Sequence, residues 1–381
     1  MHRTPLPTAD CRLLVNILGI ETSCDETAAA VVADGRRIRS NVVASQIALH
    51  RAHGGVVPEL AARGHVTAIV PVVAAALAEA GIARADIDVL AVTEGPGLAG
   101  ALLVGVNVAK AMAYALGRPL VAVNHLEAHL YANWLDGPET APRDPVFPLV
   151  CLLVSGGHTE LILMTGHGRF QHLGRTLDDA AGEAFDKGAR MLALGFPGGP
   201  AIQEAARAGD PTVFDLPRAW LPGTHDFSFS GLKTALLRLT EPFRLPPDSG
   251  PATAIDPGGL PGPFRAHRPP AYKPEAPIAN FAAAFQQAIV EPLAVKTAHA
   301  ALELGAGTVI LAGGVAANDL LRERLRQEVA VRCGDGVPVA YPQLAYCTDN
   351  AAMVAGAAVW VIRRGDLAGW EADVFPRLPL I

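Results

Sequence analysis

Apolar runs of strand and helix length alternate along this chain, with short polar turns between them. Asp34-Gly35 is a typical hairpin turn after the second run. Pro58 opens a long helical pattern, where its missing N–H costs nothing, and the pattern ends near Gly81. The apolar spacing predicts strands at residues 13–20, 28–33, 89–93 and 120–123, and helices at 58–80 and 101–116.

The same order of elements restarts near residue 150. Residues 150–154 and 160–164 are predicted strands around a polar turn, and Thr27 and Thr159 occupy matching turn-to-strand junctions. Two hairpin-headed halves suggest a duplicated α/β lobe, although chance likeness of two strand–turn–strand units explains the pattern as well. Later elements are a helix from residue 279, a strand at 308–312, and helices from 320 and at 350–362.

Length and composition agree with two lobes. The chain has 381 residues, of which 50% are hydrophobic and 18% charged, as in a compact enzyme with a large buried fraction. The proline-rich residues 241–277 lack periodicity and are interpreted as an inserted, partly disordered surface loop. We expect a loose tail at 1–12, an N-terminal lobe from 13–124 plus 350–381, and a C-terminal lobe from 125–349.

Cysteine usage and hydropathy favour a cytoplasmic protein without membrane contact. The five cysteines are widely spaced and contain no CxxC, which disfavours a disulfide framework or a zinc ribbon. No uninterrupted apolar run reaches the ~18–20 residues that a membrane helix needs. A formal net charge of −6 argues against unaided nucleic-acid binding, because phosphate contacts dominate such affinity.

The clearest metal signal is the pair His125 and His129. Four residues apart on a helix, they project from one face within reach of one ion. Taken alone, the pair fits two partly exposed surface histidines slightly better than a metal site. A zinc peptidase of the HExxH kind is excluded by spacing, because Leu126 follows the first histidine and Glu127 lies roughly 200° around the helix from it.

Two glycine-rich turns follow predicted buried strands. They are VSGGH at 154–158 and GGVAAN at 313–318. Glycine lets backbone N–H groups approach a phosphate, so two such turns favour a nucleotide held between lobes, although tight turns use glycine for steric reasons too. Neither GxxxxGK[ST] nor a GxGxxG after the first strand is present, which disfavours P-loop and dinucleotide-binding folds.

Acidic residues form two further groups. Asp25 and Glu26 lie in a turn between strands, where burial at a lobe interface would be costly without a metal, substrate or cation. The segment LDDAAGEAFDK is predicted to be helical, with Asp179, Glu183 and Asp186 on one face. Solvated helix acids are the usual explanation for that spacing.

Taken together, the motifs closely resemble those of the TsaD family. The resemblance runs from about residue 17 to about residue 362, apart from the proline-rich insert, and implies the two-lobed α/β fold of actin, the sugar kinases and the heat-shock chaperone ATPases. The motifs that carry it, in order, are GIETSCDETAAAVV, HGGVVPELAARGH, NHLEAHLYA, VSGGHTEL, LDDAAGEAFDKGARML, FPGGP, FSFSGLKTA, GGVAANDLLR and CTDNAAMVA.

The resemblance implies a reaction and a set of site residues. The reaction is transfer of a threonylcarbamoyl group from threonylcarbamoyl-AMP to N6 of adenosine 37, in tRNAs that read codons beginning with adenine. His125, His129 and Asp349 match the metal ligands of the family, with Fe²⁺ expected and Zn²⁺ as the alternative. Residues that match its substrate contacts are Leu153, Val154, Ser155, Gly156, Gly157, Asp186, Gly199 and Asn318. Leu153, in place of the tyrosine of archaeal and eukaryotic relatives, is typical of the bacterial branch.

The resemblance also implies partner proteins, and the chemistry of the adenylate indicates how catalysis should work. The expected partners are tRNA, a TsaB-like paralogue, a TsaE-like ATPase and a TsaC-like synthase that supplies the adenylate; ATP is the other expected bound nucleotide. Because the adenylate is already activated, positioning and charge stabilisation should dominate catalysis. Asp25 or Glu26 is the candidate acceptor of the N6 proton.

Three departures from the family pattern and two rival functions remain. Ala128 replaces a common glycine, Gln203 stands where some members carry an acid, and the insert at 241–277 is not a general family feature. An ATPase or kinase on the same fold would have no need for His125 and His129, and a metallopeptidase lacks its general base.

Overall fold

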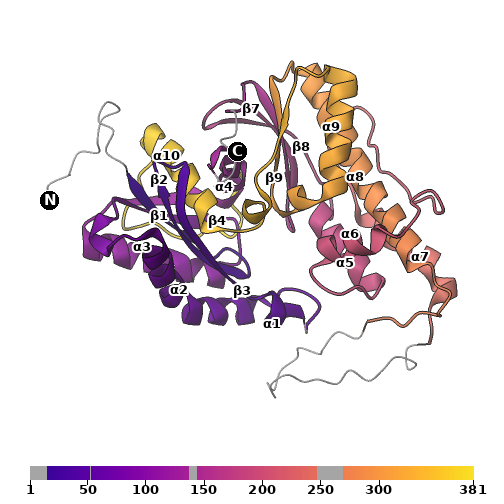
Figure 1. Ribbon diagram of the computed structural model, residues 1–381, viewed down its shortest axis with the longest axis horizontal. Coiled ribbons are helices and arrows are strands. Elements are labelled where there is room, and N and C mark those ends of the chain that lie inside the picture. The colour runs from indigo at the N-terminus through magenta and orange to yellow at the C-terminus, as the bar shows by residue number, and fades with distance from the viewer. Residues whose placement is uncertain (1–14, 52, 137–143, 247–268) are drawn as a thin grey trace.

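Two five-stranded sheets, one in each lobe, form the frame of the computed structural model (Figure 1). The structure describes residues 15–51, 53–136, 144–246 and 269–381. In the N-terminal lobe the strand order is β3-β2-β1-β4-β5, with β1, β2 and β3 antiparallel and β4 and β5 parallel to β1. These strands are β1 (Asn16–Glu21), β2 (Glu26–Ala33), β3 (Arg37–Ser45), β4 (Val89–Gly95) and β5 (Leu120–Asn124).

The second sheet repeats the topology of the first. Its order is β10-β9-β6-β7-β8, so an antiparallel hairpin head again precedes parallel strands on the other side of the first strand. Its strands are β6 (Leu149–Val154), β7 (Thr159–Gly166), β8 (Arg169–Arg175), β9 (Thr308–Ala312) and β10 (Val339–Ala340). The duplication predicted from the repeated strand–turn–strand pattern is therefore confirmed.

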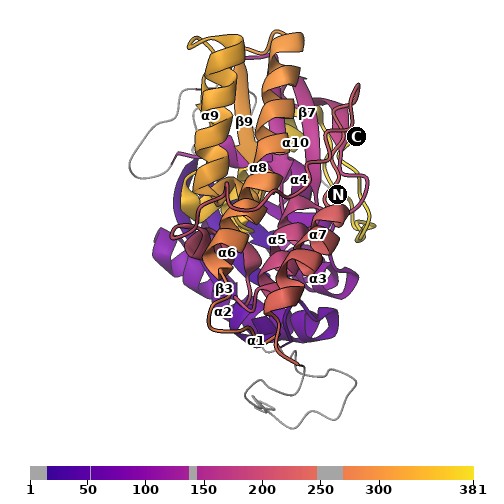
Figure 2. The ribbon, with the colours of Figure 1, turned by 90° about the vertical axis from the view of Figure 1, so that its right-hand side faces the viewer.

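Helices cover both sheets and fill the space between them (Figures 1 and 2). In the first lobe, α2 and α3 pack on one face of the sheet; in the second lobe, α5 to α9 pack on the outer face. The short helix α4 and the C-terminal α10 share one core with the inner faces of both sheets. The helices are α1 (Ile47–Arg51), α2 (Pro58–Ala80), α3 (Ala99–Leu116), α4 (His125–Tyr131), α5 (Ala181–Met191), α6 (Gly198–Ala206), α7 (Ser230–Thr240), α8 (Ile278–Glu303), α9 (Asp319–Cys333) and α10 (Ala351–Arg364).

Alternation along β6 shows how one strand serves two cores. Leu152 and Val154 face the helices of the C-terminal lobe, whereas Cys151 and Leu153 face α4 and α10. Successive side chains of a strand point to opposite faces, so a strand buried on both faces is apolar throughout. This places α4 and the start of α10 where the two lobes meet.

Local signals in the sequence agree with the structure at several element ends. Asp34 (φ 56°) and Gly35 (φ 67°) form the left-handed turn of the β2–β3 hairpin. α2 starts at Pro58 and ends at Gly81, which has the left-handed conformation typical of a helix C-terminus. The four described cysteines, Cys24, Cys151, Cys333 and Cys347, are free.

The proline-rich insert differs in part from the expected loop. A short 3₁₀ helix spans Glu241–Phe243, and backbone hydrogen bonds join Leu245 N–H to Ala271 O (2.9 Å) and Lys273 N–H to Phe243 O (2.9 Å). The two ends of the insert are therefore held together as an antiparallel stem. Residues 247–268, and the predicted tail at 1–12, lie outside the described residues.

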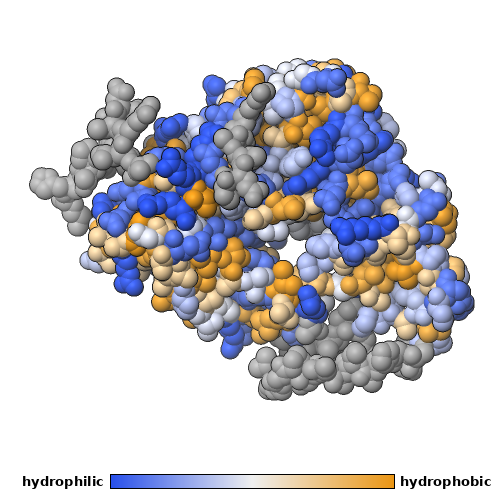
Figure 3. All heavy atoms as spheres, viewed as in Figure 1, coloured by the Kyte–Doolittle hydropathy of each residue, from blue (hydrophilic) through white to orange (hydrophobic). Residues whose placement is uncertain are grey.

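Three helices in the described part of the chain, α2, α3 and α8, have the length and apolar composition of membrane-spanning segments. α8 is packed into the C-terminal lobe, and its buried side chains lie all around it. α2 and α3 bury one side on the first sheet and expose Val66, Val70 and Leu103 on the other. Apolar side chains gather over these two helices at the lower left of Figure 3.

Candidate metal centre and interlobe cleft

The structure brings His125, His129 and Asp349 together at the junction of the lobes. α4 begins directly after β5, and Asn124 caps it by accepting from the N–H groups of Leu126 (2.8 Å) and Glu127 (3.3 Å). The Asp349 Oδ1 atom lies 3.6 Å from His125 Nε2 and 3.2 Å from His129 Nε2. One ligand atom from each of the three residues falls within 4.8 Å of the others, close enough to share one ion.

The chemistry of these three residues fits a metal ion. His129 is 1% exposed, and neither of its ring nitrogens makes a hydrogen bond within the described residues, although Nε2 faces Asp349. A buried imidazole nitrogen without a partner is costly, and metal coordination would satisfy it. Two imidazoles and one carboxylate form a donor set that suits Fe²⁺ or Zn²⁺.

Glu21, which sequence reasoning missed, contacts His125 at Nδ1, the ring nitrogen that faces away from Asp349. Its Oε2 atom lies 3.2 Å from His125 Nδ1 and accepts from Thr93 Oγ1 (2.6 Å). Burial alone would raise the pKa of Glu21, but His125 outweighs burial and lowers it. A carboxylate on the far ring nitrogen fixes the orientation of a metal-binding histidine. The signal in the sequence was an acid directly after the apolar residues 17–20 of β1.

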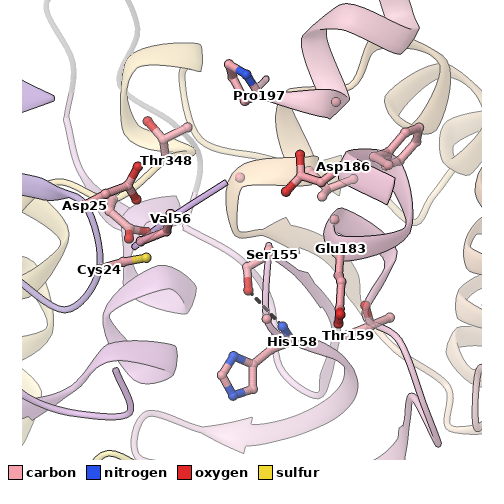
Figure 4. Close-up of a pocket in the computed structure, with 18 of the residues that line it drawn as sticks. Cys24, Asp25, Val56, Ser155, His158, Thr159, Glu183, Asp186, Pro197 and Thr348 are labelled. Carbon is pink, nitrogen blue, oxygen red and sulfur yellow. Dashed lines mark hydrogen bonds between the residues drawn. The ribbon is translucent and has the colours of Figure 1, made fainter. Parts of the chain in front are cut away.

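A cleft of about 1550 Å³ opens between the lobes beside this centre. Figure 4 shows Cys24 and Asp25 on one side of the cleft, and Ser155, Glu183 and Asp186 on the other. His125 and Asp349 also line it. The metal centre and the cleft therefore form one site.

The two glycine-rich turns lie next to each other in the wall of this cleft. They follow β6 and β9, which are parallel neighbours. Gly313 has φ +86°, and a Cβ atom there would lie 2.4 Å from the Val154 carbonyl oxygen. Gly156 and Gly157 are exposed, with open space where a side chain would stand. The backbone of these turns is thus accessible to a ligand, as expected for phosphate binding.

Leu153 and Val154, by contrast, are completely buried in β6 and do not line the cleft. The side chains of Leu153 and Val154 therefore have no access to a ligand in the cleft. These two residues end the strand that leads into the turn at Ser155. Ser155 itself accepts from the His158 N–H through Oγ (3.1 Å), and the His158 carbonyl accepts from the Ser155 N–H (2.8 Å). The turn is therefore closed by its own hydrogen bonds.

The other predicted substrate residues lie around the cleft, Gly199 and Asn318 at helix starts and Asp186 within α5. Asp186 accepts from the Gly198 N–H (2.7 Å) at the start of α6, and Gly199 follows with open space at its Cα. Asn318 caps α9 by accepting from the Leu321 N–H (3.0 Å). Asp186, Gly199 and Asn318 all line the cleft. Gln203 joins the two helices, because its amide pairs with both the side chain and the N–H of Asp319.

Asp25 and Glu26 both line the cleft but differ in their surroundings. Asp25 is 9% exposed in the turn before β2, whereas Glu26 begins the strand and accepts from Ser45 Oγ (2.9 Å). Burial, followed by the charge of Asp25, raises the pKa of Glu26 to about 9. Burial and the neighbouring charge of Asp25 thus both oppose ionisation of Glu26.

The prediction of one acidic helix face was wrong for Asp179. α5 starts at Ala181, so Asp178 and Asp179 precede it. Asp179 and Glu183 both bind Lys187 Nζ, at 2.6 and 2.9 Å. The helix period failed here because Asp178 and Asp179 belong to the turn that enters α5.

Basic residues on and near the cleft do not form one patch. Lys187 lines the cleft but is paired with acids, and Arg190 lines it and donates to the Gly54 carbonyl. Lys233 is exposed on α7 and does not line the cleft. Sequence reasoning also missed Arg377, which the C-terminal segment 376–379 brings to the cleft wall.

Comparison with known proteins identifies the family of the chain. The sequence model of the TsaD family, described as tRNA N6-adenosine threonylcarbamoyltransferase, matches residues 37–356. The protein of that name from Thermomicrobium roseum is 60% identical over 367 residues, covering 96% of this chain and 97% of the relative. The one from Dehalococcoides mccartyi is 50% identical over 364 residues, covering 96% and 99%.

Solved structures support the fold. HypF from T. kodakarensis matches with a TM-score of 0.56 at 15% identity, over 94% of this chain and 49% of HypF. A likeness at this identity concerns architecture alone, and it agrees with two duplicated α/β lobes of the actin-like ATPase type. The family model and the near full-length relatives establish more: this chain belongs to the TsaD family of tRNA N6-adenosine threonylcarbamoyltransferases.

Proposed function

We propose that this protein transfers the threonylcarbamoyl group of threonylcarbamoyl-AMP to N6 of adenosine 37, in tRNAs that read codons beginning with adenine. The observation that carries the proposal is that the His125–His129–Asp349 cluster and both glycine turns open into one interlobe cleft. A nucleotide at the turns would place its activated carbonyl near the metal centre. An ATPase or kinase would need the turns but not the histidines.

The proposed metal is Fe²⁺, with Zn²⁺ as the alternative, held by His125, His129 and Asp349. When bound, the metal supplies Lewis-acid polarisation of a substrate oxygen. Glu21 holds His125 through Nδ1 and so leaves Nε2 directed at the ion.

The glycine turns are proposed to bind the adenylate. Backbone N–H groups of Gly156 and Gly157 and of the segment after Gly313 would donate to its phosphate, and the start of α9 adds the positive end of a helix dipole. Because these donors are already in place, little reorganisation is needed when charge develops on the leaving AMP.

Asp25 is proposed to accept the proton from the N6 amine. It lies in the cleft wall, and its neighbour Glu26 is hydrogen-bonded to Ser45. A carboxyl that is already protonated cannot serve as a base, so the raised pKa of Glu26 favours Asp25 for this step.

The proposed partners follow from family membership and from the surface. tRNA is the acceptor, a TsaC-like synthase supplies the adenylate, and a TsaE-like ATPase assists in the cytoplasm. A TsaB-like paralogue is proposed as a protein partner, and the apolar strip on α2 and α3 (Val66, Ile69, Val70, Leu103, Val104 and Val108) supports a protein partner on this face.

The test is reconstitution of the reaction. Purified protein, unmodified tRNA, threonylcarbamoyl-AMP, the two partner proteins and ATP are incubated, and digested nucleosides are measured by mass spectrometry. Modified adenosine that disappears with His125→Ala would support the proposal. No product, with the same partners active alongside another TsaD, would refute it and favour the ATPase or kinase function.

A further inference from the structure

The last residues of the chain return to the cleft and form part of its wall. The Ala368 N–H donates to the Leu120 carbonyl (3.0 Å), and the Phe375 N–H donates to the Glu94 carbonyl (2.8 Å). The segment therefore runs from the start of β5 to the end of β4. Residues 376–379 beyond it line the cleft.

Hydrogen bonds fix the backbone of this segment on both sides of Arg377. The Pro376 carbonyl before it accepts from the Gly97 N–H (3.3 Å). After it, Asn124 Nδ2 donates to the carbonyls of Leu378 (3.4 Å) and Pro379 (3.1 Å). Asn124 is also the cap of α4, which carries the two histidines. One side chain thus links the segment around Arg377 to the helix of the metal centre.

The Arg377 side chain is exposed and available to a ligand. Across residues 15–51, 53–136, 144–246 and 269–381 it makes no hydrogen bond or ion pair. Lys187, Arg190 and Arg207, also in the cleft lining, each bind a protein group. Arg175, at the end of β8 in the opposite lobe, is the other lining arginine whose side chain makes no hydrogen bond or ion pair among the described residues. Of the described residues that the N-terminal lobe contributes to this lining, Arg377 is the only cation, and it faces a site with several acids.

An exposed, unpaired guanidinium on a tethered backbone suits a phosphate group. Its planar donors match phosphate bidentately, and tethering lowers the entropy lost on binding. Two phosphates come near this cleft in the proposed reaction, that of the adenylate and those of the tRNA backbone. The glycine turns that would hold the adenylate phosphate belong to the opposite lobe, which leaves the tRNA backbone for Arg377.

We propose that Arg377 binds a backbone phosphate of the tRNA whose adenosine enters the cleft. The inference rests on the proposed function for its acceptor and adds a contact point on the enzyme. A chain with a formal net charge of −6 must place individual cations where the polyanion arrives, and Arg377 stands at the edge of the metal-bearing cleft.

The test uses Arg377→Gln and Arg377→Lys, with Arg84→Gln as the matched control. Arg84 is an exposed arginine of the same lobe that does not line the cleft. Binding of fluorescently labelled, unmodified tRNA to the enzyme with its partners is measured by anisotropy at several salt concentrations, after circular dichroism has shown that each variant is folded. We expect Arg377→Gln to weaken binding about tenfold. The slope of log affinity against log salt should become shallower by about 0.7–0.9.

Arg377→Lys should retain part of the affinity and the full salt slope, and Arg84→Gln should match the wild type. The KM for threonylcarbamoyl-AMP should not change in any variant. A raised KM for the adenylate with unchanged tRNA affinity would assign the guanidinium to the adenylate and overturn the proposal. Unchanged KM and unchanged tRNA affinity in Arg377→Gln would overturn it as well. Wild-type protein that binds tRNA but forms no modified adenosine would instead refute the proposed reaction.

Discussion

Glu127 and Arg364 form a bidentate ion pair across the junction of α4 and α10. The Arg364 Nη1 and Nη2 atoms lie 2.6 and 3.1 Å from the two carboxylate oxygens of Glu127. The Glu127 side chain is 6% exposed. The acid within the HLEAH sequence thus points away from the metal ligands and holds two helices together, which agrees with the helical spacing that excluded a peptidase.

Loss of this pair should cost stability while leaving the metal in place. Arg364→Ala leaves a buried carboxylate without its main partner, so we expect the free energy of unfolding to fall by about 3 kcal/mol. Urea denaturation measures this, and metal analysis of the folded protein should give the wild-type content. A Glu127→Gln variant that kept normal stability but lost the reaction would contradict the structural role of this acid.

Glu21 should tune metal affinity through His125. Glu21→Gln keeps the shape of the side chain but removes the charge that faces His125 Nδ1, and we expect metal affinity to fall about 10–100-fold. Competition with a chelator, followed by metal analysis, gives the affinity without any activity assay. Glu94→Gln, on the neighbouring β4, is the control and should bind metal normally. Equal affinities for both variants would show that Glu21 does not act on the centre.

The proton acceptor can be identified by comparing two neighbours. Asp25→Asn should lower kcat about 10²–10⁴-fold without changing metal content, since the proposed general base is removed. Glu26→Gln resembles the protonated carboxyl that the raised pKa indicates, so we expect a much smaller loss. Single-turnover transfer with saturating tRNA and adenylate measures both. Full transfer by Asp25→Asn would eliminate this residue as the base.

Asp178 should stabilise the protein in a pH-dependent way. It accepts from the N–H groups of Phe229 (2.8 Å) and Ser230 (3.2 Å) and from the hydroxyls of Ser228 and Ser230, at the start of α7. Partial burial would raise the pKa of Asp178, but these hydrogen bonds outweigh it and lower the pKa. A carboxyl with a lowered pKa in the folded state stabilises it above the unfolded pKa, and this contribution is lost as pH falls through the folded value.

Asp178→Ala should therefore lose about 1–2 kcal/mol at pH 7, the usual cost of a helix cap. The difference from the wild type should shrink as pH falls below about 4. Thermal unfolding followed from pH 7 to pH 3 checks this. A difference that stayed constant over the whole range would show that the charge of Asp178 contributes nothing.

Most elements were predictable because their signals are local. The apolar run of β6 and the Pro58 and Gly81 ends of α2 depend on neighbouring residues only. The repeated hairpin heads revealed the duplicated lobes for the same reason. Asp179 was misplaced because the helix period continues through LDD, although the chain enters α5 only at Ala181.

The site was less predictable because its contacts join distant segments. His125 and His129 could be paired from their spacing, but Asp349 came only from family resemblance, since more than two hundred residues separate it from α4. Glu21 meets His125 across the sheet, and no periodicity shows that contact. The wall around Arg377 depends on hydrogen bonds from Asn124 to the last residues of the chain.

A final prediction concerns the contact between the two glycine turns. Gly313 (φ 86°, ψ 169°) and Gly334 (φ 79°, ψ 168°) share one backbone conformation, so alanine should be strained equally at both, by about 1–3 kcal/mol. Only at Gly313 would the new Cβ meet backbone, 2.4 Å from the Val154 carbonyl oxygen, whereas Gly334 has open space. Gly313→Ala should therefore cost about 1–3 kcal/mol more than Gly334→Ala.

Comparing Gly313→Ala with Gly334→Ala also distinguishes an effect on folding from an effect on ligand binding. To relieve the contact, Gly313→Ala must push the Val154–Ser155 backbone away from the start of its own turn, which displaces the N–H groups proposed to bind phosphate. AMP binding measured by calorimetry should weaken at least tenfold for Gly313→Ala and stay normal for Gly334→Ala, whose glycine lies at the far end of α9. If both variants bound AMP equally well, the nucleotide would not depend on the junction of β6 and β9, and the phosphate would have to be held elsewhere in the cleft.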